Sequence, residues 1–196
     1  MLSPRQLRDT LIIVLDHAMP ACAQVEYRVV GTGAALLQGV SLPTGDVDIL
    51  VKERASVDTF GSALASFKCL FSPAWIPHGR QYYAEYEVNG VGVDISTVEG
   101  ETDSDGIECL GRGPWEHYVL VSCGPYAIPA VALELRLVSE LSRNRPDRYA
   151  PLIQHMQVNG CDIELVRRGM EARSLSQTLQ ENVLGQLKGA SVDRVG

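Results

Sequence analysis

The chain has 196 residues and a net charge of −7, with 45% hydrophobic and 21% charged residues, which is ordinary for a soluble globular protein. No apolar run is long enough to span a bilayer, the N-terminus lacks a signal-peptide pattern, and the acidic balance argues against a broad basic surface for nucleic acid. The cysteines are scattered without a C-x-x-C pair, which predicts reduced thiols in a cytoplasmic protein: Cys22, Cys69, Cys109, Cys123 and Cys161.

The first predicted element is an N-terminal helix. Ser3 and Gln6 have the spacing of a capping box, and Pro4 suits the first helical position. Apolar residues then recur at helical spacing, at Leu7, Leu11, Leu15 and Met19. Pro20 is predicted to end this helix, because proline lacks the amide hydrogen that a helix interior needs.

The next stretch predicts a strand, a glycine turn, a short helix and a second strand. The strand Tyr27–Val30 leads into Gly31-Thr32-Gly33, which lets the backbone turn tightly and opens a helix over Ala34–Gln38. Pro43-Thr44-Gly45 then leads into the strand Asp46–Val51. Because backbone amides at a helix start attract anions, the glycine turn is a candidate phosphate-binding element.

Asp46 and Asp48 are one residue apart in a predicted strand, so their side chains project to the same face. Neighbouring carboxylates repel each other, and a bound divalent cation removes that penalty. An ordinary turn followed by two solvated aspartates is the alternative, and it would suffice for either feature alone. Found together at this spacing, the two features favour a metal site.

Two less regular segments follow. A helix is predicted from Ser56 or Asp58 to about Phe67. The segment Lys68–Ile76 is interpreted as a short strand and a loop.

A hairpin is predicted around Asn89-Gly90, because alternating apolar residues flank this two-residue turn over residues 81–96. This register places Glu85 directly opposite Asp94 on the polar face. Opposed like charges are unfavourable without a nearby cation. Glu85 has two interpretations: a residue near the metal, or an edge charge that keeps the sheet soluble.

The rest of the chain predicts an exposed acidic loop over 98–113, a short helix or strand over Trp115–Val121, and a long buried helix over Ala130–Leu141. Further helices are predicted over Tyr149–Gln157, Asp162–Ala172 and Ser176–Leu187. We expect an N-terminal core over residues 1–110, a helical subdomain over 111–188 and a flexible tail over 189–196.

A group of arginines follows the long helix, at Arg143, Arg145 and Arg148. Guanidinium groups suit phosphate oxygens, so these side chains are candidates to bind phosphate groups. They are equally consistent with surface charges around a corner between two helices.

The order of these motifs resembles the polymerase β-like nucleotidyltransferase superfamily, especially its small bacterial members, among them abortive-infection-type toxins and antibiotic nucleotidyltransferases. Their motif has the form Gly-Gly-Thr-Ala…Thr-x-Asp-x-Asp, and this chain has Gly31-Thr32-Gly33-Ala34…Thr44-Gly45-Asp46-Val47-Asp48. The resemblance implies an α/β (α+β) fold: a mixed sheet flanked by helices, with a helical C-terminal part. The match is weaker at Pro146-Asp147, where relatives carry Lys-Asp.

The activity that this resemblance implies is transfer of a nucleoside monophosphate from a nucleoside triphosphate, such as ATP, to a hydroxyl. Two Mg²⁺ ions, with Mn²⁺ as a substitute, would be held by Asp46, Asp48 and Asp94. The nucleotide would be bound by Gly31, Thr32, Gly33, Thr44, Arg143 and Arg145. A tRNA end, a protein or a small molecule would be the acceptor. The alternative function is an inactive nucleotide-binding or partner-binding module of a toxin–antitoxin pair, with a cognate antitoxin as partner.

Overall fold

The computed structural model describes residues 1–100, 108 and 111–192, and the structural statements below concern these residues. The strands are β1 (Tyr27–Val30), β2 (Asp46–Val51), β3 (Lys68–Ile76), β4 (Gln81–Val88), β5 (Val91–Ser96), β6 (Tyr118–Cys123) and β7 (Tyr126–Val131). The helices are α1 (Pro4–Cys22), α2 (Gly31–Leu37), α3 (Arg54–Ala63), α5 (Gly113–Glu116), α6 (Leu133–Ser142), α7 (Pro146–Asn159), α8 (Ile163–Ala172) and α9 (Gln177–Val192).

The strands form one mixed sheet of seven strands in the order β3-β4-β5-β2-β1-β7-β6. β2 pairs in parallel with β5, and β1 pairs in parallel with β7, whereas the other neighbours are antiparallel. The parallel pairing of β2 and β5 brings two segments that are far apart in the sequence side by side. The mixed sheet confirms the predicted α/β class.

The hairpin of β4 and β5 has the predicted turn and the predicted register. Asn89 and Gly90 both have positive φ, at 52° and 79°, which is the conformation that a two-residue hairpin turn requires. Glu85 lies opposite Asp94. Alternate residues of the hairpin are buried on the face that α1 and α3 cover, and they are Ala84, Tyr86, Val88, Val91, Val93 and Ile95. The opposite face therefore carries the polar side chains.

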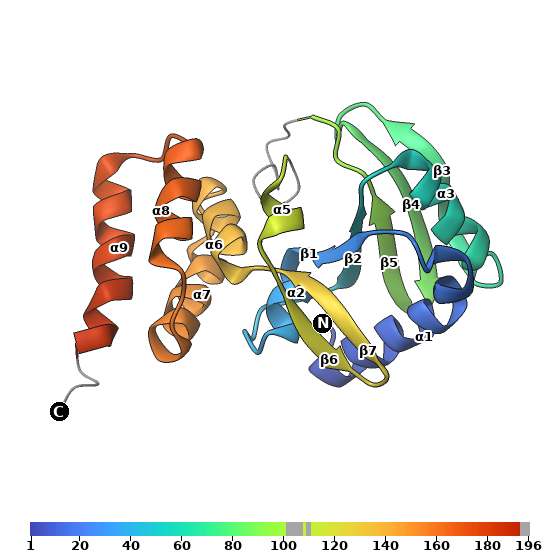
Figure 1. Ribbon diagram of the computed structural model, residues 1–196, viewed down its shortest axis with the longest axis horizontal. Helices are drawn as coiled ribbons and strands as arrows, with labels where there is room; N and C mark the ends of the chain where they lie inside the picture. The colour runs from blue at the N-terminus through green and yellow to red at the C-terminus, as the bar shows by residue number, and fades with distance from the viewer. Residues whose placement is uncertain (101–107, 109–110, 193–196) are drawn as a thin grey trace.

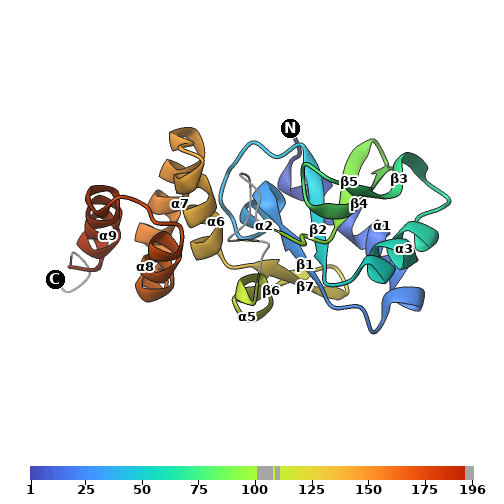
Figure 2. The same ribbon diagram turned by 90° about the horizontal axis from the view of Figure 1, so that it is seen from above.

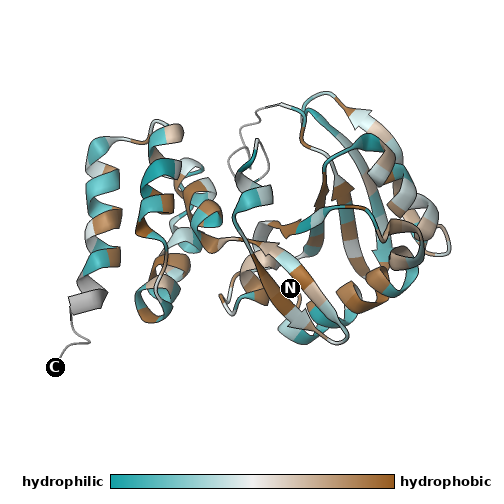
Figure 3. Ribbon diagram, viewed as in Figure 1, coloured by the Kyte–Doolittle hydropathy of each residue, from teal (hydrophilic) through white to brown (hydrophobic). Residues whose placement is uncertain are grey.

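Two hydrophobic cores hold the fold together. The larger core lies between the sheet and helices α1 and α3, and the smaller one lies among α6, α7, α8 and α9. Helices α2 and α6 contribute to both, since Ala34 and Leu135 belong to the larger core and Ala35 and Leu137 to the smaller one. Hydrophobic residues are concentrated in the central strands, while the C-terminal helices mix hydrophobic and hydrophilic residues along their length (Figure 3).

The C-terminal helices lie to one side of the sheet, with α6 nearest to it and α9 farthest away (Figures 1 and 2). The structure corrects where this helical part begins. Residues 126–131 form β7, and α6 starts only at Leu133, not at Ala130 as predicted. The reason is that Ala130 pairs with Val29 of β1, so pairing within the sheet overrides local helical preference at this point. Both β6 and β7 belong to the sheet although they follow residue 110.

Several other element boundaries also differ from prediction. α1 continues through Pro20 to Cys22, so the proline is accommodated within the last turn of the helix instead of ending it. α3 starts at Arg54 and ends at Ala63, and Lys68–Ile76 is strand throughout. α2 begins at Gly31 itself, so the glycine turn is the first turn of this helix. Trp115–Val121 divides into the end of α5 and the start of β6.

Some predictions concern residues outside the described part of the chain. Most of the predicted acidic loop, residues 101–107 and 109–110, and the last four residues of the predicted tail are in this group, as is Cys109. Within residues 1–100, 108 and 111–192, no helix is both long enough and apolar enough to cross a membrane.

Candidate active site

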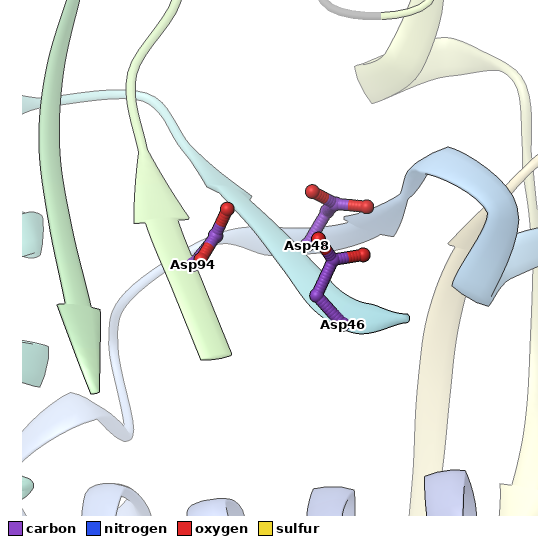
Figure 4. Close-up of side chains that lie close together, drawn as sticks. All are labelled: Asp46, Asp48 and Asp94. Atoms are coloured by element: carbon purple, nitrogen blue, oxygen red, sulfur yellow. The ribbon is translucent and has the colours of Figure 1, made fainter. Parts of the chain in front are cut away.

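Asp46 and Asp48 of β2 and Asp94 of β5 come together on the polar face of the sheet. The parallel register pairs Asp48 with Asp94 and Asp46 with Gly92. Each carboxylate offers one oxygen, and these three oxygens lie within 4.8 Å of one another. The side chains gather where β2 and β5 run side by side (Figure 4). Sequence reasoning therefore identified a real cluster, although the two strands are separated by β3 and β4 in the chain.

The electrostatics of the three aspartates, which we call the Asp triad, suit a cation. Burial, opposed in part by a hydrogen bond from Tyr83, raises the pKa of Asp94 to about 6, and the charges of Asp46 and Glu85 add to the rise. A divalent cation would relieve this repulsion. Carboxylate oxygens are the hard ligands that Mg²⁺ and Mn²⁺ prefer, so the residues fit the expected metal.

The polar face continues beyond the Asp triad as a row across the sheet. Asp48, Asp94 and Glu85 are successive partners across β2, β5 and β4, and Phe71 of β3 follows them. The Tyr83 hydroxyl lies 3.2 Å from Glu85 Oε2 and also hydrogen-bonds Asp94. Burial and the charges of both carboxylates raise the pKa of Tyr83, so this hydroxyl remains a donor. Glu85 thus lies beside the Asp triad, as predicted from the hairpin register.

The backbone of Gly31 approaches the Asp triad closely at Asp48. A Cβ atom at this position would lie 2.1 Å from Asp48 Oδ2, and the φ of Gly31 is +67°. Only glycine meets both requirements without strain. The Gly31 amide donates a hydrogen bond of 2.9 Å to Glu108 Oε1, so in this structure its partner is a carboxylate of the chain itself.

The other residues predicted to bind nucleotide differ in their surroundings. Thr32 and Gly33 are buried in the first turn of α2. Thr44 is 1% exposed, and its hydroxyl donates to the carbonyl oxygens of Thr32 and Leu42, at 3.3 and 3.2 Å. Thr44 therefore ties the start of α2 to the segment that leads into β2, and its contact with a nucleotide stays a prediction.

The arginine group lies at the junction of α6 and α7. Arg145 forms an ion pair of 2.8 Å with Asp147, and Arg148 forms one of 3.3 Å with Glu140. Arg143 follows the last residue of α6 and is half-buried. These pairs fit the interpretation of charges at a helix corner, and phosphate binding by Arg143 and Arg145 stays a prediction.

Sequence reasoning missed a set of fully buried charges. Glu108 and Glu140 are 0% exposed and Arg136 is 1% exposed, and Arg136 pairs with both carboxylates. One signal was available in the sequence, because Arg136 and Glu140 are four residues apart within a predicted buried helix and so lie on one face. Glu108 gave no such signal, since it stands in a segment read as an exposed loop.

Comparison with known proteins places this arrangement in context. No family model matches the sequence, and no curated protein is significantly similar to it. Among solved structures, a Thermotoga maritima protein proposed to be a nucleotidyltransferase matches 81% of this chain and 96% of its own, with a TM-score of 0.55 and 20% identity. The antibiotic-resistance factor ANT(2'')-Ia matches 89% of this chain and 97% of its own, with a TM-score of 0.53 and 13% identity.

Both likenesses extend over most of the chain. They agree with the motif resemblance, and neither bears on the toxin subtype. This chain has the fold of the polymerase β-like nucleotidyltransferases.

Proposed function

We propose that this protein is a metal-dependent nucleotidyltransferase, which moves a nucleoside monophosphate from a nucleoside triphosphate to a hydroxyl of an acceptor. The observation that carries the proposal is the Asp triad: three carboxylate oxygens within 4.8 Å on the polar face of a sheet with the nucleotidyltransferase fold. Asp46, Asp48 and Asp94 are the proposed metal ligands. When bound there, Mg²⁺ would neutralise triphosphate charge and stabilise the attacking and leaving oxygens.

The nucleotide is proposed to lie on the side of the Asp triad that faces α2. Gly31 supports this placement, because its lack of a side chain lets the backbone approach Asp48 closely. The Gly31 amide already has Glu108 as partner, so we assign phosphate contacts first to the backbone of Thr32 and Gly33. Thr44, Arg143 and Arg145 remain proposed contributors to nucleotide binding.

The acceptor hydroxyl is proposed to approach from the opposite side, over β5 and β4. Glu85 and Tyr83 lie there, and their oxygens can form hydrogen bonds with a hydroxyl-bearing acceptor. An RNA end, a protein and a small molecule are all retained as acceptors for testing. The choice of ATP among nucleotides, a cognate antitoxin and a cytoplasmic location also remain predictions.

Label transfer tests the proposal directly. Purified protein would be incubated with Mg²⁺, each α-labelled nucleoside triphosphate in turn, and a cell extract that contains RNA, protein and metabolites. The double variant Asp46→Asn/Asp48→Asn would run beside it. Asp9→Asn is the matched control, because Asp9 is an exposed residue of α1 whose side chain, 60% exposed, pairs with Arg5 on the same helix.

We expect label on one class of acceptor with the wild type and with Asp9→Asn, and none with the double variant. Survival of transfer in Asp48→Asn would contradict the assigned role of the Asp triad. Mg²⁺-dependent binding of nucleotide without transfer to any acceptor would instead support the alternative function, an inactive nucleotide-binding module.

A further inference from the structure

A buried charge network crosses the boundary between the sheet and the C-terminal helices. It consists of Glu108, Arg136 and Glu140, whose side chains are 1% exposed or less, and of Arg148, which is 21% exposed. Arg136 of α6 pairs with both carboxylates, and Arg148 of α7 pairs with Glu140. Arg136 is therefore held between two acidic groups in a region that water does not reach.

One end of this network touches the glycine turn. Glu108 Oε1 accepts the hydrogen bond from the Gly31 amide, at 2.9 Å. The α-carbon of Gly31 in turn lies against Asp48, whose Oδ2 would be only 2.1 Å from a Cβ at that position. The Gly31 backbone is thus part of the wall that confines the Asp48 carboxylate. A small shift of this backbone would change the room in which Asp48 can turn.

The other end of the network lies among the C-terminal helices. Leu135 of α6 packs in the larger core and Leu137 in the smaller one, so Arg136 stands between the two cores. Arg148 extends the network to α7. The contacts therefore run from α7 and α6 through Glu108 and Gly31 to a proposed metal ligand.

Stability alone does not account for this arrangement. Burying charges carries a large desolvation cost, and apolar replacements of whole buried ion pairs are often neutral or stabilising. Two residues of the network also have a poorly satisfied atom, since the buried Glu140 Oε2 and Arg148 Nε have no hydrogen-bond partner within the described part of the chain. A buried polar network that costs this much free energy points to a role in fixing the positions of the groups that it contacts.

We propose that Arg136 is a positioning residue for the metal site, acting through Glu108 and Gly31 on Asp48. The inference rests on the proposed function for the importance of the metal, but its test needs only metal binding. Groups that hold a ligand in place through a hydrogen bond typically affect metal affinity by about 10- to 100-fold when they are removed. The C-terminal helices would then contribute to the metal site itself.

The test measures Mn²⁺ binding by electron paramagnetic resonance in the full chain, with Asp48→Asn to establish that the bound ion occupies the Asp triad. We expect Arg136→Met to weaken Mn²⁺ binding about tenfold or more. Arg136→Lys, which keeps the positive charge beside Glu108, should restore most of the affinity. Near-ultraviolet circular dichroism would check that each variant is folded.

A matched control is another buried arginine with carbonyl and carboxylate partners. Arg28 of β1 is 4% exposed, donates to the carbonyl oxygens of Pro114 and Trp115, and pairs with Glu26. Arg28→Met should also lower stability, yet it should leave Mn²⁺ affinity unchanged. A loss of affinity in both variants would overturn the proposal, because it would reflect general destabilisation.

A second variant covers the case in which Arg136→Met does not fold. Arg136→Met/Glu140→Gln removes one positive and one negative charge, so the net charge is unchanged. It also avoids leaving the buried Glu140 carboxylate without its Arg136 partner. We expect the same weakening of Mn²⁺ binding. Wild-type affinity in this double variant, or tighter binding in Arg136→Met, would overturn the proposal in favour of a purely structural or purely electrostatic role. Absence of label transfer by the wild type would count against the proposed function only.

Discussion

Gly31 is a residue at which the backbone comes close to Asp48, and it allows a sharp substitution test. Gly31→Ala would place a methyl group against Asp48 Oδ2 and would force an alanine into a left-handed φ of +67°. Strain of this kind costs about 1–3 kcal/mol, and the clash adds displacement of a metal ligand. We expect lower stability together with a loss of Mn²⁺ binding and label transfer.

Gly45→Ala is the control for this substitution. Gly45 directly precedes Asp46, yet a Cβ there would meet nothing within 4 Å. Metal binding and transfer should be unchanged in this variant. Equal losses of metal binding and transfer in both variants would mean that any change near β2 disrupts the site. That result would contradict a specific role for Gly31.

Asp94 provides the prediction of pH dependence. Its pKa of about 6 in the folded protein is above the ordinary value of 3.8, because it is partly buried and close to Asp46 and Glu85, despite the hydrogen bond from Tyr83. The folded state therefore takes up a proton more readily than the unfolded state. The resulting stabilisation is fully present below about pH 4 and is lost as the pH rises through about 6.

Metal-free wild type should accordingly lose about 1–3 kcal/mol of stability between pH 4 and pH 7.5 through this one group. Asp94→Asn should lack that contribution and should be the more stable protein at pH 7.5. Urea unfolding in the presence of a chelator, at several pH values, measures the difference between the two proteins. A difference that does not vary with pH would contradict the raised pKa.

At the scale of elements, local signals were sufficient where neighbouring residues decide the structure. The capping box of Ser3 and Gln6 forms as predicted, and Asn89-Gly90 sets the hairpin register that brings Glu85 opposite Asp94. The Asp-x-Asp spacing likewise places both carboxylates on one strand face. Each of these features depends on residues within a few positions of one another.

Contacts between distant segments explain what the sequence could not show. β7 is a strand because it pairs with β1 and β6, and the residues next to Ala130 in the sequence do not indicate those partners. β3 has irregular pairing around Phe71, which breaks the alternation that would reveal a strand. Glu108 has acidic and glycine neighbours typical of a loop, and its burial depends on Arg136, 28 residues away.

At the scale of the whole molecule, the sheet and the C-terminal helices share structural elements. α2 and α6 each supply residues to both hydrophobic cores, and the buried charge network joins the same two parts. Separate unfolding of either part would expose apolar surface of the other and would leave buried charges without partners. We therefore predict that the described fold unfolds in one cooperative transition, even though the sequence suggested two regions.

The two tryptophans make this prediction testable, because Trp75 is in β3 and Trp115 in α5, both outside the C-terminal helices. Tryptophan fluorescence therefore reports on the sheet part, while circular dichroism at 222 nm reports on the helices of both parts, α6 to α9 included. Leu137→Ala, at a fully buried position of the smaller core, should cost about 2–5 kcal/mol. It should shift both unfolding curves together, whereas Gln154→Ala, at an exposed position of α7, should shift neither. A shift of the dichroism curve alone would show that α6 to α9 unfold independently of the sheet part. The proposed effect of Arg136 on the metal site would then operate only while these helices are folded.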